Sequence, residues 1–385
     1  MTHRFFSSLL FFSWLPALLC GHFHFQELES KMTPQELQAS GIKKLSPKEK
    51  TYLETWLIRK HHQYQISIPK AKNDEPVKWT YIAKKRKPYK RKYDPRLYDE
   101  AKIPYNLAIF SLFQHESKYL REWIEYHKLL GVEHFYLYNN LSNDNYHKVL
   151  APYIKRGEVT LVQWPYYDPD GAAPYFWCEM QKRAYENAMD KARGKYRWMA
   201  FIDTDEFLVP MKHNTILDFL NGYEAYGGVI VNWVIFGTSY VDTIGPGELM
   251  IDKLVMRALD SNQENNKVKS IVKPHRVEWW PSPHWCEYQP GYFAVDSNHS
   301  KAPVRSQYND ARPMDLIRLH HYWYRDASFY WNVKVPRWRK TAWQLTDKEF
   351  QWREYEGNKI WDPTIRYFVP QLQQRMRKHH DTKNS

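Results

Sequence analysis

Glycine and cysteine are scarce in this sequence, and their small numbers exclude several classes of protein. Only 14 of the 385 residues are glycine, and none of them falls in a GxGxxG or a GxxxxGK motif. The sequence therefore lacks the fingerprints of a dinucleotide-binding enzyme and of a P-loop NTPase. Its three cysteines, Cys20, Cys178 and Cys286, are too few for a disulfide framework or a four-cysteine zinc site.

Hydrophobic and aromatic residues are abundant, as in a globular protein. Hydrophobic residues make up 43% of the chain and charged residues 26%, which excludes a disordered chain, a coiled coil and a collagen-like fibre. Lysine and arginine outnumber the acidic residues by 56 to 43, which gives a formal net charge of +13. The 17 tryptophans and 29 tyrosines suit a core, stacking on sugars or bases, or a membrane interface.

An apolar segment close to the amino terminus predicts export or membrane attachment. Residues 5–19 are apolar apart from three serines and one proline, and His3 and Arg4 precede them. This arrangement is typical of a secretory signal, and the segment is shorter than the ~20 residues of a membrane-spanning helix. We therefore expect residues 1–20 to be a signal peptide or an N-terminal anchor, and the protein to be membrane-associated or exported. The alternatives are a hydrophobic terminus packed on the protein and, less favoured, a lipid on Cys20.

Two further segments precede the region of regular periodicity. Residues 33–60 have the proline, glycine and capping signals of a small helical segment. Residues 70–100 form a basic linker without apolar periodicity, in which seven lysines and arginines gather between positions 84 and 92. This linker is either a flexible tether or a segment attracted to anionic lipid or a polyanionic glycan. No nucleic-acid-binding motif occurs, so we expect no nucleic acid partner.

From residue 104 onward the sequence predicts strands that alternate with helices. The expected strands cover residues 106–113, 132–138, 159–164, 196–202 and 228–236, and the expected helices cover 118–130, 145–156 and 177–193. This alternation indicates an α/β fold with a mostly parallel, Rossmann-type sheet flanked by helices. We expect this domain to extend over residues 104–345 and a helical or polar tail to follow over residues 346–385.

The loop after the fourth expected strand carries three acidic residues, Asp203, Asp205 and Glu206. Ligands of such sheets bind beyond the carboxyl ends of the strands, which is where this loop lies. Three neighbouring carboxylates repel one another in a cleft unless a cation offsets their charge. A Mn²⁺ or Mg²⁺ ion that bridges the Asp-x-Asp pair and the diphosphate of a nucleotide sugar fits this pattern. A solvated loop that contains the pattern by chance is equally compatible with it.

A second polar loop, residues 138–144, follows the second expected strand. Its Asn140, Ser142 and Asp144 are turn-forming residues, which favours a turn and a helix cap. Its place at the same edge of the sheet equally favours contact with the base or ribose of a nucleotide.

Six blocks of sequence between residues 105 and 334 carry a resemblance to one family. The first three are residues 116–127, residues 138–144, and Gln181, Tyr185 and Trp198 with residues 201–207. The other three are residues 233–237, residues 269–274, and His321, Tyr322, Arg325 and Lys334. In this order they resemble glycosyltransferase family 92, whose pattern reads NE-x-x-YL-x-EWI-x-YH, YDN-x-S-x-D, Q…Y…W-x-x-F-x-D-x-DEF, W-x-x-FG, K-x-IV-x-P and HY-x-x-K-S…K. The sequence departs from that pattern at Gln114, His115, Asn139 and Asp326.

The resemblance implies a GT-A fold and inverting transfer of a hexose from a UDP-sugar, with galactose as the best-known hexose. It implies that Asp203, Asp205 and His321 hold Mn²⁺ or Mg²⁺, and Mn²⁺ is favoured because it accepts a neutral imidazole better. It also implies a set of residues that bind the nucleotide-sugar donor, with the last two facing the leaving phosphates: Glu116, Asn140, Ser142, Asp144, Gln181, Asp203, Arg325 and Lys334.

Inversion requires one general base that deprotonates the acceptor hydroxyl, and the acceptor side is expected after Gly237. The candidate bases are His284, Glu287 and Asp315. His284 lies in a tryptophan-rich segment, residues 279–285, which is suited to stacking on sugars. A histidine with a purely structural role is the plainer interpretation of His284.

We therefore predict a metal-dependent inverting glycosyltransferase that moves a hexose from a UDP-sugar to a glycan acceptor. The alternative is a noncatalytic carbohydrate- or polyanion-binding surface protein, which explains the tryptophans, the positive charge and export but not the acidic loop. A phosphatase or nuclease with a two-metal site needs more clustered histidine and aspartate ligands than the sequence offers.

Overall fold

The computed structural model describes most of the chain after residue 98, together with one short hairpin. The described residues are 66–69, 76–79, 99–165, 174–339 and 345–381. The predicted signal or anchor over residues 1–20 and the predicted helical segment over residues 33–60 lie outside them. Among the helices that are described, none is long and apolar enough to cross a membrane.

The chain divides into two units, of which the first comprises residues 1–86 and 173–177. Its described part contains a hairpin of two antiparallel strands, β1 (Ile66–Pro69) and β2 (Pro76–Trp79). Strand β2 lies within residues 70–100, where the sequence predicts a linker without regular structure. The basic run of that linker is outside the described residues.

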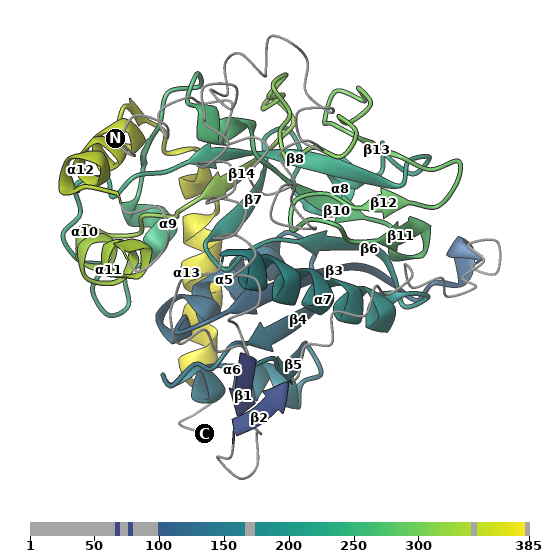
Figure 1. Ribbon diagram of the computed structural model, residues 1–385, viewed down its shortest axis with the longest axis horizontal. Coiled ribbons are helices and arrows are strands. Elements are labelled where there is room, and N and C mark those ends of the chain that lie inside the picture. The colour runs from purple at the N-terminus through teal and green to yellow at the C-terminus, as the bar shows by residue number, and fades with distance from the viewer. Residues whose placement is uncertain (1–65, 70–75, 80–98, 166–173, 340–344, 382–385) are drawn as a thin grey trace, which may run out of the picture. The chain divides into compact units, whose positions relative to one another are not determined.

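The second unit, residues 87–172 and 178–385, contains a nine-stranded sheet in its described part (Figure 1). The strand order is β5-β4-β3-β6-β10-β8-β14-β7, and a ninth strand, β13, pairs with β8. The strands are β3 (Tyr105–Phe113), β4 (His134–Asn139), β5 (Val159–Gln163), β6 (Tyr196–Phe201), β7 (Glu206–Pro210), β8 (Gly228–Ile235), β10 (Val268–Val272), β13 (Ala294–Val295) and β14 (Ile317–His321).

The strand directions divide this sheet into two halves. Strands β5, β4, β3 and β6 run parallel, as the alternation of strands and helices predicts. Strand β10 is antiparallel to both β6 and β8, and β7 is antiparallel to β14, whereas β14 is parallel to β8. The second half is mixed because the chain between β8 and β10 forms short helical turns, α9 (Met250–Lys253) and η5 (Gln263–Asn266), in place of a crossover helix. The predicted α/β class is confirmed, and the parallel arrangement holds for the first half.

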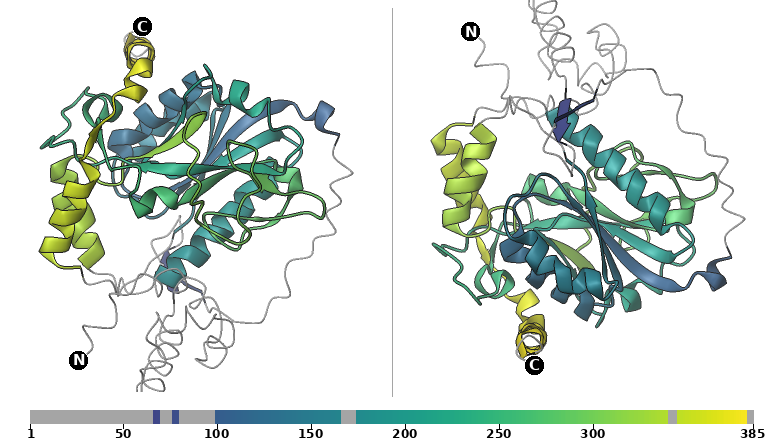
Figure 2. Two further views of the ribbon diagram at one scale, coloured as in Figure 1. Left: turned by 90° about the horizontal axis from the view of Figure 1, so that it is seen from above. Right: turned by 90° about the horizontal axis from the view of Figure 1, so that it is seen from below.

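Helices cover both faces of the sheet (Figure 2). One face carries α5 (Ser117–Leu129), α6 (Tyr146–Lys155) and α13 (Val369–Asp381), and the other carries α7 (Pro174–Ala192). The predicted apolar stripe of α5 is buried, which confirms the helix and its orientation. The indole Nε1 of Trp123 in this stripe donates to the carbonyl of Glu206 at 2.8 Å, so α5 fixes the start of β7.

Two hydrophobic clusters fill the layers between the sheet and the helices. The larger cluster joins α5, α6 and α13 to the sheet. The smaller cluster lies under α7, where the rings of Phe110, Tyr185 and Trp280 meet at centroid distances of 4.7 Å and 5.0 Å. Tyr185 therefore reaches from α7 to the neighbourhood of β6, where the acidic loop begins.

Short elements connect and extend this framework. They are η4 (Glu100–Lys102), α8 (Ile216–Leu220), β9 (Met256–Arg257), η6 (Pro274–Arg276), β11 (Val277–Trp279), β12 (Glu287–Tyr288), α10 (Ala327–Phe329), the π-helical turn η7 (Tyr330–Lys334), α11 (Val335–Arg339), α12 (Asp347–Gly357), β15 (Ile360–Trp361) and η8 (Thr364–Phe368).

Residues after 345 belong to the same core as the sheet, so the predicted boundary at residue 345 does not separate a tail. Phe350, Ile365 and Leu372 are fully buried in the larger cluster, and β15 pairs with β9. The sequence signal for this packing is weak because α12 buries only Phe350 and Gly357, and a helix with so few buried positions shows no apolar stripe.

The amino-terminal end of the domain is fixed by a buried ionic cluster around Glu100. Its carboxylate pairs with Lys273, whose Nζ lies 2.6 Å away, and with the Nε2 of His275 at 2.8 Å. Burial by itself raises the pKa of Glu100, but hydrogen bonds from His275 and Lys273 outweigh it and hold this pKa well below its usual value. Lys273 is fully buried and pairs also with Glu224. The domain therefore includes Glu100, a few residues before the predicted start at residue 104.

Candidate active site

The polar loops of the molecule meet at one edge of the sheet. The carboxyl ends of β3, β4 and β6 lie there, and the residues that follow β6 lead directly into β7. His321, the last residue of β14, stands opposite Glu206, the first residue of β7. This register brings the acidic loop and the end of β14 together although 115 positions separate the two residues in sequence.

Asp205 has two basic side chains as neighbours, His321 and Lys334. Its Oδ1 lies 3.6 Å from the Nε2 of His321, and its Oδ2 accepts a hydrogen bond from the Nζ of Lys334 at 3.3 Å. Burial raises the pKa of Asp205, but the positive charge of Lys334 and the contact with His321 outweigh it and hold this pKa well below its usual value. Asp205 is therefore an ionised carboxylate with a histidine and a lysine as neighbours.

Asp203 faces a different partner. Its Oδ2 accepts a hydrogen bond from the Nζ of Lys269 at 2.9 Å, and its Oδ1 lies 3.5 Å from the Nε2 of Gln181. Lys269 exposes only 2% of its side chain, and burial lowers its pKa, but Asp203 and Glu206 together raise that pKa well above the usual value. Lys269 is thus a buried ammonium ion that neutralises the first aspartate of the loop.

Glu206 lies beneath the loop and exposes none of its surface. Its Oε2 accepts a hydrogen bond from the backbone N–H of Asp203 at 2.8 Å, and the Nζ of Lys269 is 3.8 Å away. Its Oε1 is buried and has no hydrogen-bond partner among the described residues. Burial raises the pKa of Glu206 well above its usual value. Its hydrogen bond with the backbone of Asp203 supports the acidic loop.

The donor atoms of Asp205 and His321 fit one side of a divalent ion's coordination shell. A carboxylate oxygen and an imidazole nitrogen 3.6 Å apart are both ligands that Mn²⁺ accepts, and substrate phosphates commonly complete such a site. Among the described residues, no group of three or more His, Cys, Asp or Glu side chains is gathered closely enough to hold a metal. Asp203 turns to Lys269 instead, so the three-residue metal site remains a prediction.

Trp233 connects His321 to His284. The indole ring lies 4.3 Å from the ring of His321 and 5.5 Å from the ring of His284, measured between centroids. The Nδ1 of His284 lies 2.9 Å from the carbonyl oxygen of Val268 and donates to it, which leaves the lone pair of the ring on Nε2. Burial and the charge of Lys269 hold the pKa of His284 well below its usual value, so the imidazole is neutral.

The other two candidate bases lie apart from this cluster. Glu287, in β12, forms an ion pair with the exposed Arg305 at 2.7 Å, and no described contact joins it to the acidic loop. Asp315 is exposed and precedes β14 at the end of the strand remote from His321. Of the three candidates, His284 is the one whose ring contacts Trp233, which in turn contacts His321.

Arg325 and Glu116 form a buried pair behind Asp205. Arg325 exposes none of its surface, forms a salt bridge with Glu116 and packs its guanidinium 3.9 Å from the ring centroid of Tyr119. Burial raises the pKa of Glu116, and the charge of Arg325 opposes this effect. Because Arg325 is enclosed, its expected contact with the donor phosphates is not available in this conformation, and Lys334 is the nearer cation.

The second polar loop is tied to the loop that precedes α5. Ser142 Oγ accepts a hydrogen bond from the backbone N–H of His115 at 2.9 Å, and Asp144 Oδ2 accepts one from that of Ser117 at 2.8 Å. Asn140 is buried, and its backbone N–H donates to the carbonyl of Phe113 at 2.8 Å. These bonds tie the loop to the start of α5, whereas α6, the helix that follows the loop, has no side-chain cap at its N-terminus. Contacts with a nucleotide at this loop remain a prediction.

Lys269 and Trp233 are the residues whose roles the sequence reasoning missed. Lys269 is the one charged residue among the five of the fully buried strand β10, and a lone charge in such a strand is a signal for a buried partner. The partner, Asp203, is 66 positions away, and local patterns do not show contacts at that separation. Trp233 begins the block over residues 233–237, but that pattern assigns no contact to its side chain, which lies in the buried strand β8.

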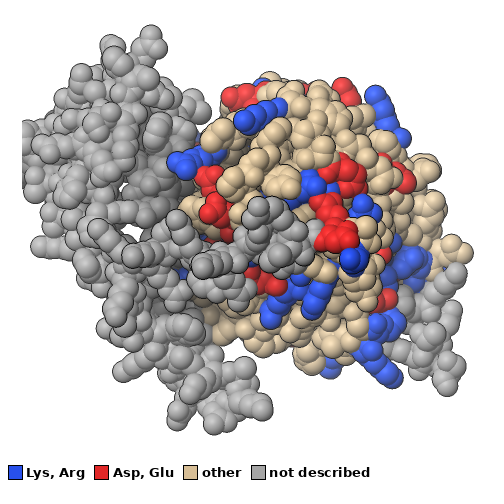
Figure 3. Space-filling model, turned by 90° about the vertical axis from the view of Figure 1, so that its right-hand side faces the viewer, with Lys and Arg blue, Asp and Glu red and all other residues tan. Residues whose placement is uncertain are grey.

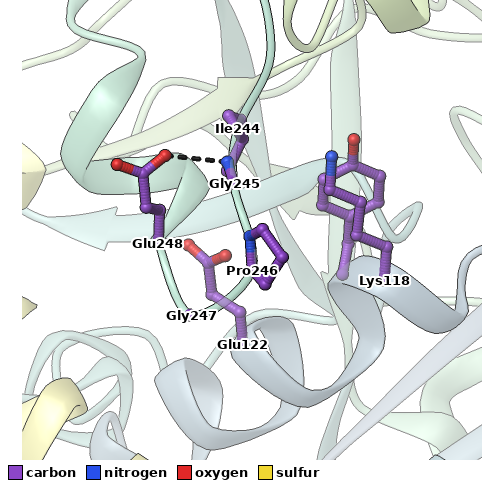
Figure 4. Close-up of a pocket in the computed structure, with 8 residues that line it drawn as sticks. Lys118, Glu122, Ile244, Gly245, Pro246, Gly247 and Glu248 are labelled. Carbon is purple, nitrogen blue, oxygen red and sulfur yellow. Dashed lines mark hydrogen bonds between the residues drawn. The ribbon is translucent and has the colours of Figure 1, made fainter.

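A cavity of about 450 Å³ lies between α5 and the loop before α9 (Figure 4). Its lining is Lys118, Tyr119, Glu122 and residues 244–248. Glu122 accepts hydrogen bonds from the backbone N–H groups of Met250 and Ile251 at 2.9 Å and 3.0 Å, and burial raises its pKa to about 7. Because its carboxylate accepts these two bonds from the first residues of α9, the role of Glu122 is to hold this helical turn in place.

A mixed sheet flanked by helices makes this an α/β protein. Its candidate site is the acidic loop at the carboxyl ends of the parallel strands, next to the end of β14. The chain belongs to glycosyltransferase family 92, whose model matches residues 108–301. The predicted family is thereby confirmed. The match covers the acidic loop and Lys269, and it ends before β14.

Curated relatives match parts of the chain. A glycosyltransferase family 92 protein of Oryza sativa subsp. japonica is 30% identical over 120 residues, which are 31% of this chain and 19% of the rice protein. One of Arabidopsis thaliana is 25% identical over 179 residues, which are 45% of this chain and 29% of that protein. The chain thus matches less than a third of the length of either relative.

Solved glycosyltransferase structures align with the chain at low similarity. Staphylococcus aureus TarS, residues 1–349, is 11% identical with a TM-score of 0.29, over 65% of this chain and 70% of that chain. Glucosyl-3-phosphoglycerate synthase from Mycobacterium tuberculosis, in complex with Mn²⁺, uridine diphosphate and glucosyl-3-phosphoglycerate, is 14% identical with a TM-score of 0.26, over 49% and 64% of the two chains.

Proposed function

We propose that this protein is a metal-dependent inverting glycosyltransferase that moves a hexose from a UDP-sugar to a glycan acceptor, with galactose as the first hexose to test. The observation that carries the proposal is the meeting of Asp205 and His321 at 3.6 Å on the strand-end edge of the sheet. Membership of glycosyltransferase family 92 supports the reaction class.

Asp205 and His321 are the residues that would hold the divalent ion, and Asp203 joins them only if it leaves Lys269. A bound divalent ion would neutralise the charge that develops on the departing diphosphate. Lys334, whose Nζ lies 3.3 Å from Asp205, adds a second positive charge at the same position. The two cations would thus stabilise the leaving group from adjacent sides.

His284 is the proposed general base. Its Nδ1 proton is held by the carbonyl of Val268, so Nε2 is free to take the proton of an acceptor hydroxyl as its oxygen attacks the anomeric carbon. The C–O bond to the acceptor forms while the bond to the diphosphate breaks, which inverts the anomeric centre. The ring contacts of Trp233 with both His284 and His321 support an acceptor position beside the donor position.

A donor screen tests the proposal. UDP-, GDP- and CMP-sugars are compared by thermal shift with Mn²⁺ and with EDTA, because a ligand that binds the folded state raises its melting temperature. We expect UDP-galactose or another UDP-hexose to raise the melting temperature only when Mn²⁺ is present. A shift that is the same with Mn²⁺ and with EDTA contradicts metal dependence.

Adjacent histidines supply a matched pair of variants for the same assay. His321→Ala and Asp205→Asn should each abolish the Mn²⁺-dependent shift, because they remove the two proposed ligands. His320→Ala should retain it, because the ring of His320 packs on Phe236 at 4.4 Å on the other side of the strand. Unchanged Mn²⁺ dependence in Asp205→Asn would remove the main physical support for the transferase.

A noncatalytic carbohydrate- or polyanion-binding protein is the other outcome of this screen. Such a protein would bind glycans without any UDP-sugar and without Mn²⁺. On the face of the molecule in Figure 3, acidic and basic side chains lie intermixed, so the visible part of this face offers no continuous basic tract for a polyanion.

We also propose that residues 1–20 direct the protein to a membrane or to export, on the strength of the apolar run over residues 5–19. Cell fractionation tests this proposal. The protein should be found in the membrane or exported fraction, and a full-length pool confined to the cytosol contradicts it.

A further inference from the structure

The two aspartates of the acidic loop are paired with lysines that differ in exposure. Lys269 comes from the central strand β10, exposes 2% of its side chain and touches Asp203 at 2.9 Å. Its Nζ also lies 3.5 Å from the hydroxyl of Tyr185 and 3.8 Å from Glu206. Lys269 is thus almost fully buried and has three polar neighbours, of which Asp203 is the nearest.

Lys334 is held much less tightly. It ends the π-helical turn η7, and such turns are frequent at functional sites. Its Nζ contacts Asp205 at a longer distance, 3.3 Å, and lies 5.1 Å from the ring centroid of Trp323. Its side chain is 12% exposed, six times the exposed fraction of Lys269. The contact of Lys334 with Asp205 is therefore the longer and the more exposed of the two lysine–aspartate pairs.

These two ion pairs oppose the binding of a divalent ion in the absence of a diphosphate. In the structure described, each aspartate already has an ammonium group within 3.3 Å. A divalent ion at Asp205 would stand close to the charge of Lys334 and be repelled by it. The anionic oxygens of a diphosphate offset this repulsion, because they attract both the ion and the ammonium group of Lys334.

We propose that Lys334 is an exchangeable counter-ion of Asp205 and Lys269 a fixed counter-ion of Asp203, so that a divalent ion and a nucleoside diphosphate bind together rather than independently. The diphosphate takes over Lys334, and this exchange frees Asp205 Oδ2 for the ion. Only ion pairs and hydrogen bonds change partners in this step. The inference rests on the proposed function, since it assigns the order of events at the same site.

Titration of the full chain with Mn²⁺, followed by the electron paramagnetic resonance signal of the free ion, tests the proposal. In the unaltered protein, UDP at saturating concentration should tighten Mn²⁺ binding about tenfold or more, and Mn²⁺ should tighten UDP binding by the same factor. Lys334→Met should bind Mn²⁺ alone about tenfold more tightly than the unaltered protein, because one repelling charge is gone. Lys334→Arg keeps the charge and should behave like the unaltered protein.

Lys118→Met is the matched control. Lys118 is a half-exposed lysine paired with Asp326 at 3.4 Å, so its removal changes the net charge equally without touching the acidic loop. The proposal is overturned if Lys334→Met binds Mn²⁺ alone no more tightly than Lys118→Met. It is also overturned if UDP binds the unaltered protein and leaves its Mn²⁺ affinity unchanged.

The same experiment separates this inference from the proposed function. If UDP does not bind at any Mn²⁺ concentration, the proposed function fails, while the comparison of Lys334→Met with Lys334→Arg in Mn²⁺ alone still decides the role of the lysine. Thermal unfolding of each variant shows whether it is folded. Lys269→Met serves as a second variant, and its Mn²⁺ affinity without UDP should rise as well.

Discussion

At the scale of single residues, two adjacent histidines of β14 have opposite surroundings. His321 faces Asp205, whereas His320 is fully buried and neither of its ring nitrogens has a hydrogen-bond partner among the described residues. Burial lowers the pKa of His320 from 6.5 to about 3. The alternation of side chains along a strand explains the difference, because adjacent residues of β14 point to opposite faces.

The buried histidines make the domain sensitive to acid. In the unfolded chain His320 is protonated below about pH 6.5, whereas in the folded chain it stays neutral down to about pH 3. Stability therefore falls as the pH falls through this window, by about 1.4 kcal/mol per pH unit for each such histidine. His320→Phe removes this contribution, so the pH dependence of its free energy of unfolding should be shallower between pH 6 and pH 4.

Urea denaturation at several pH values measures this effect. His147→Phe, the same substitution at an exposed position, is the matched control. Equal pH dependence in His320→Phe and in the unaltered protein would show that His320 is protonated without penalty in the folded state.

At the scale of elements, the sequence predicts the first half of the domain well and the second half poorly. Helix α5 and strands β3 to β6 follow from periodicity, because each is covered by a helix that repeats apolar residues on one face. After β8 the chain uses short turns and antiparallel pairing, for which the sequence has no comparably regular signal. Helix α13 is a similar case, because among its described side chains only Val369 and Leu372 are buried, in an otherwise polar sequence.

Leu372 provides a test of the carboxyl-terminal packing. Leu372→Ala should destabilise the domain by about 2–5 kcal/mol, because it leaves a cavity in the larger hydrophobic cluster. Gln373→Ala, at an exposed neighbour, should change stability little. Chemical denaturation of both variants gives the comparison, and equal stability would mean that residues after 345 form a separate tail.

At the scale of the whole molecule, the candidate site is assembled from segments that are distant in sequence. The acidic loop was found from its composition, and His321 and Lys334 from the resemblance to a family. Neither source showed that Asp203 turns to Lys269 while Asp205 turns to His321. This division depends on the order of β6, β10, β8 and β14 in the sheet, which a sequence without crossover helices does not reveal.

The start of the folded domain gives a second prediction at this scale. A chain that lacks residues 1–98 should keep the ionic cluster around Glu100 and unfold cooperatively. A chain that lacks residues 1–100 leaves His275 without this partner and removes one of the two carboxylates of Lys273, which should cost about 3 kcal/mol or more. Thermal unfolding of the two truncated chains decides the matter, and equal melting temperatures would show that Glu100 contributes nothing.

The most direct test of the proposed reaction is to follow UDP-galactose by proton NMR in the presence of the protein, Mn²⁺ and a set of glycan acceptors. An inverting, metal-dependent transferase should convert the α-anomeric signal of the donor into the β-anomeric signal of a new glycoside, and EDTA or Asp205→Asn should prevent the conversion. An α-linked product would contradict inversion. Conversion that continues unchanged in EDTA and in Asp205→Asn would contradict the metal site at Asp205 and His321.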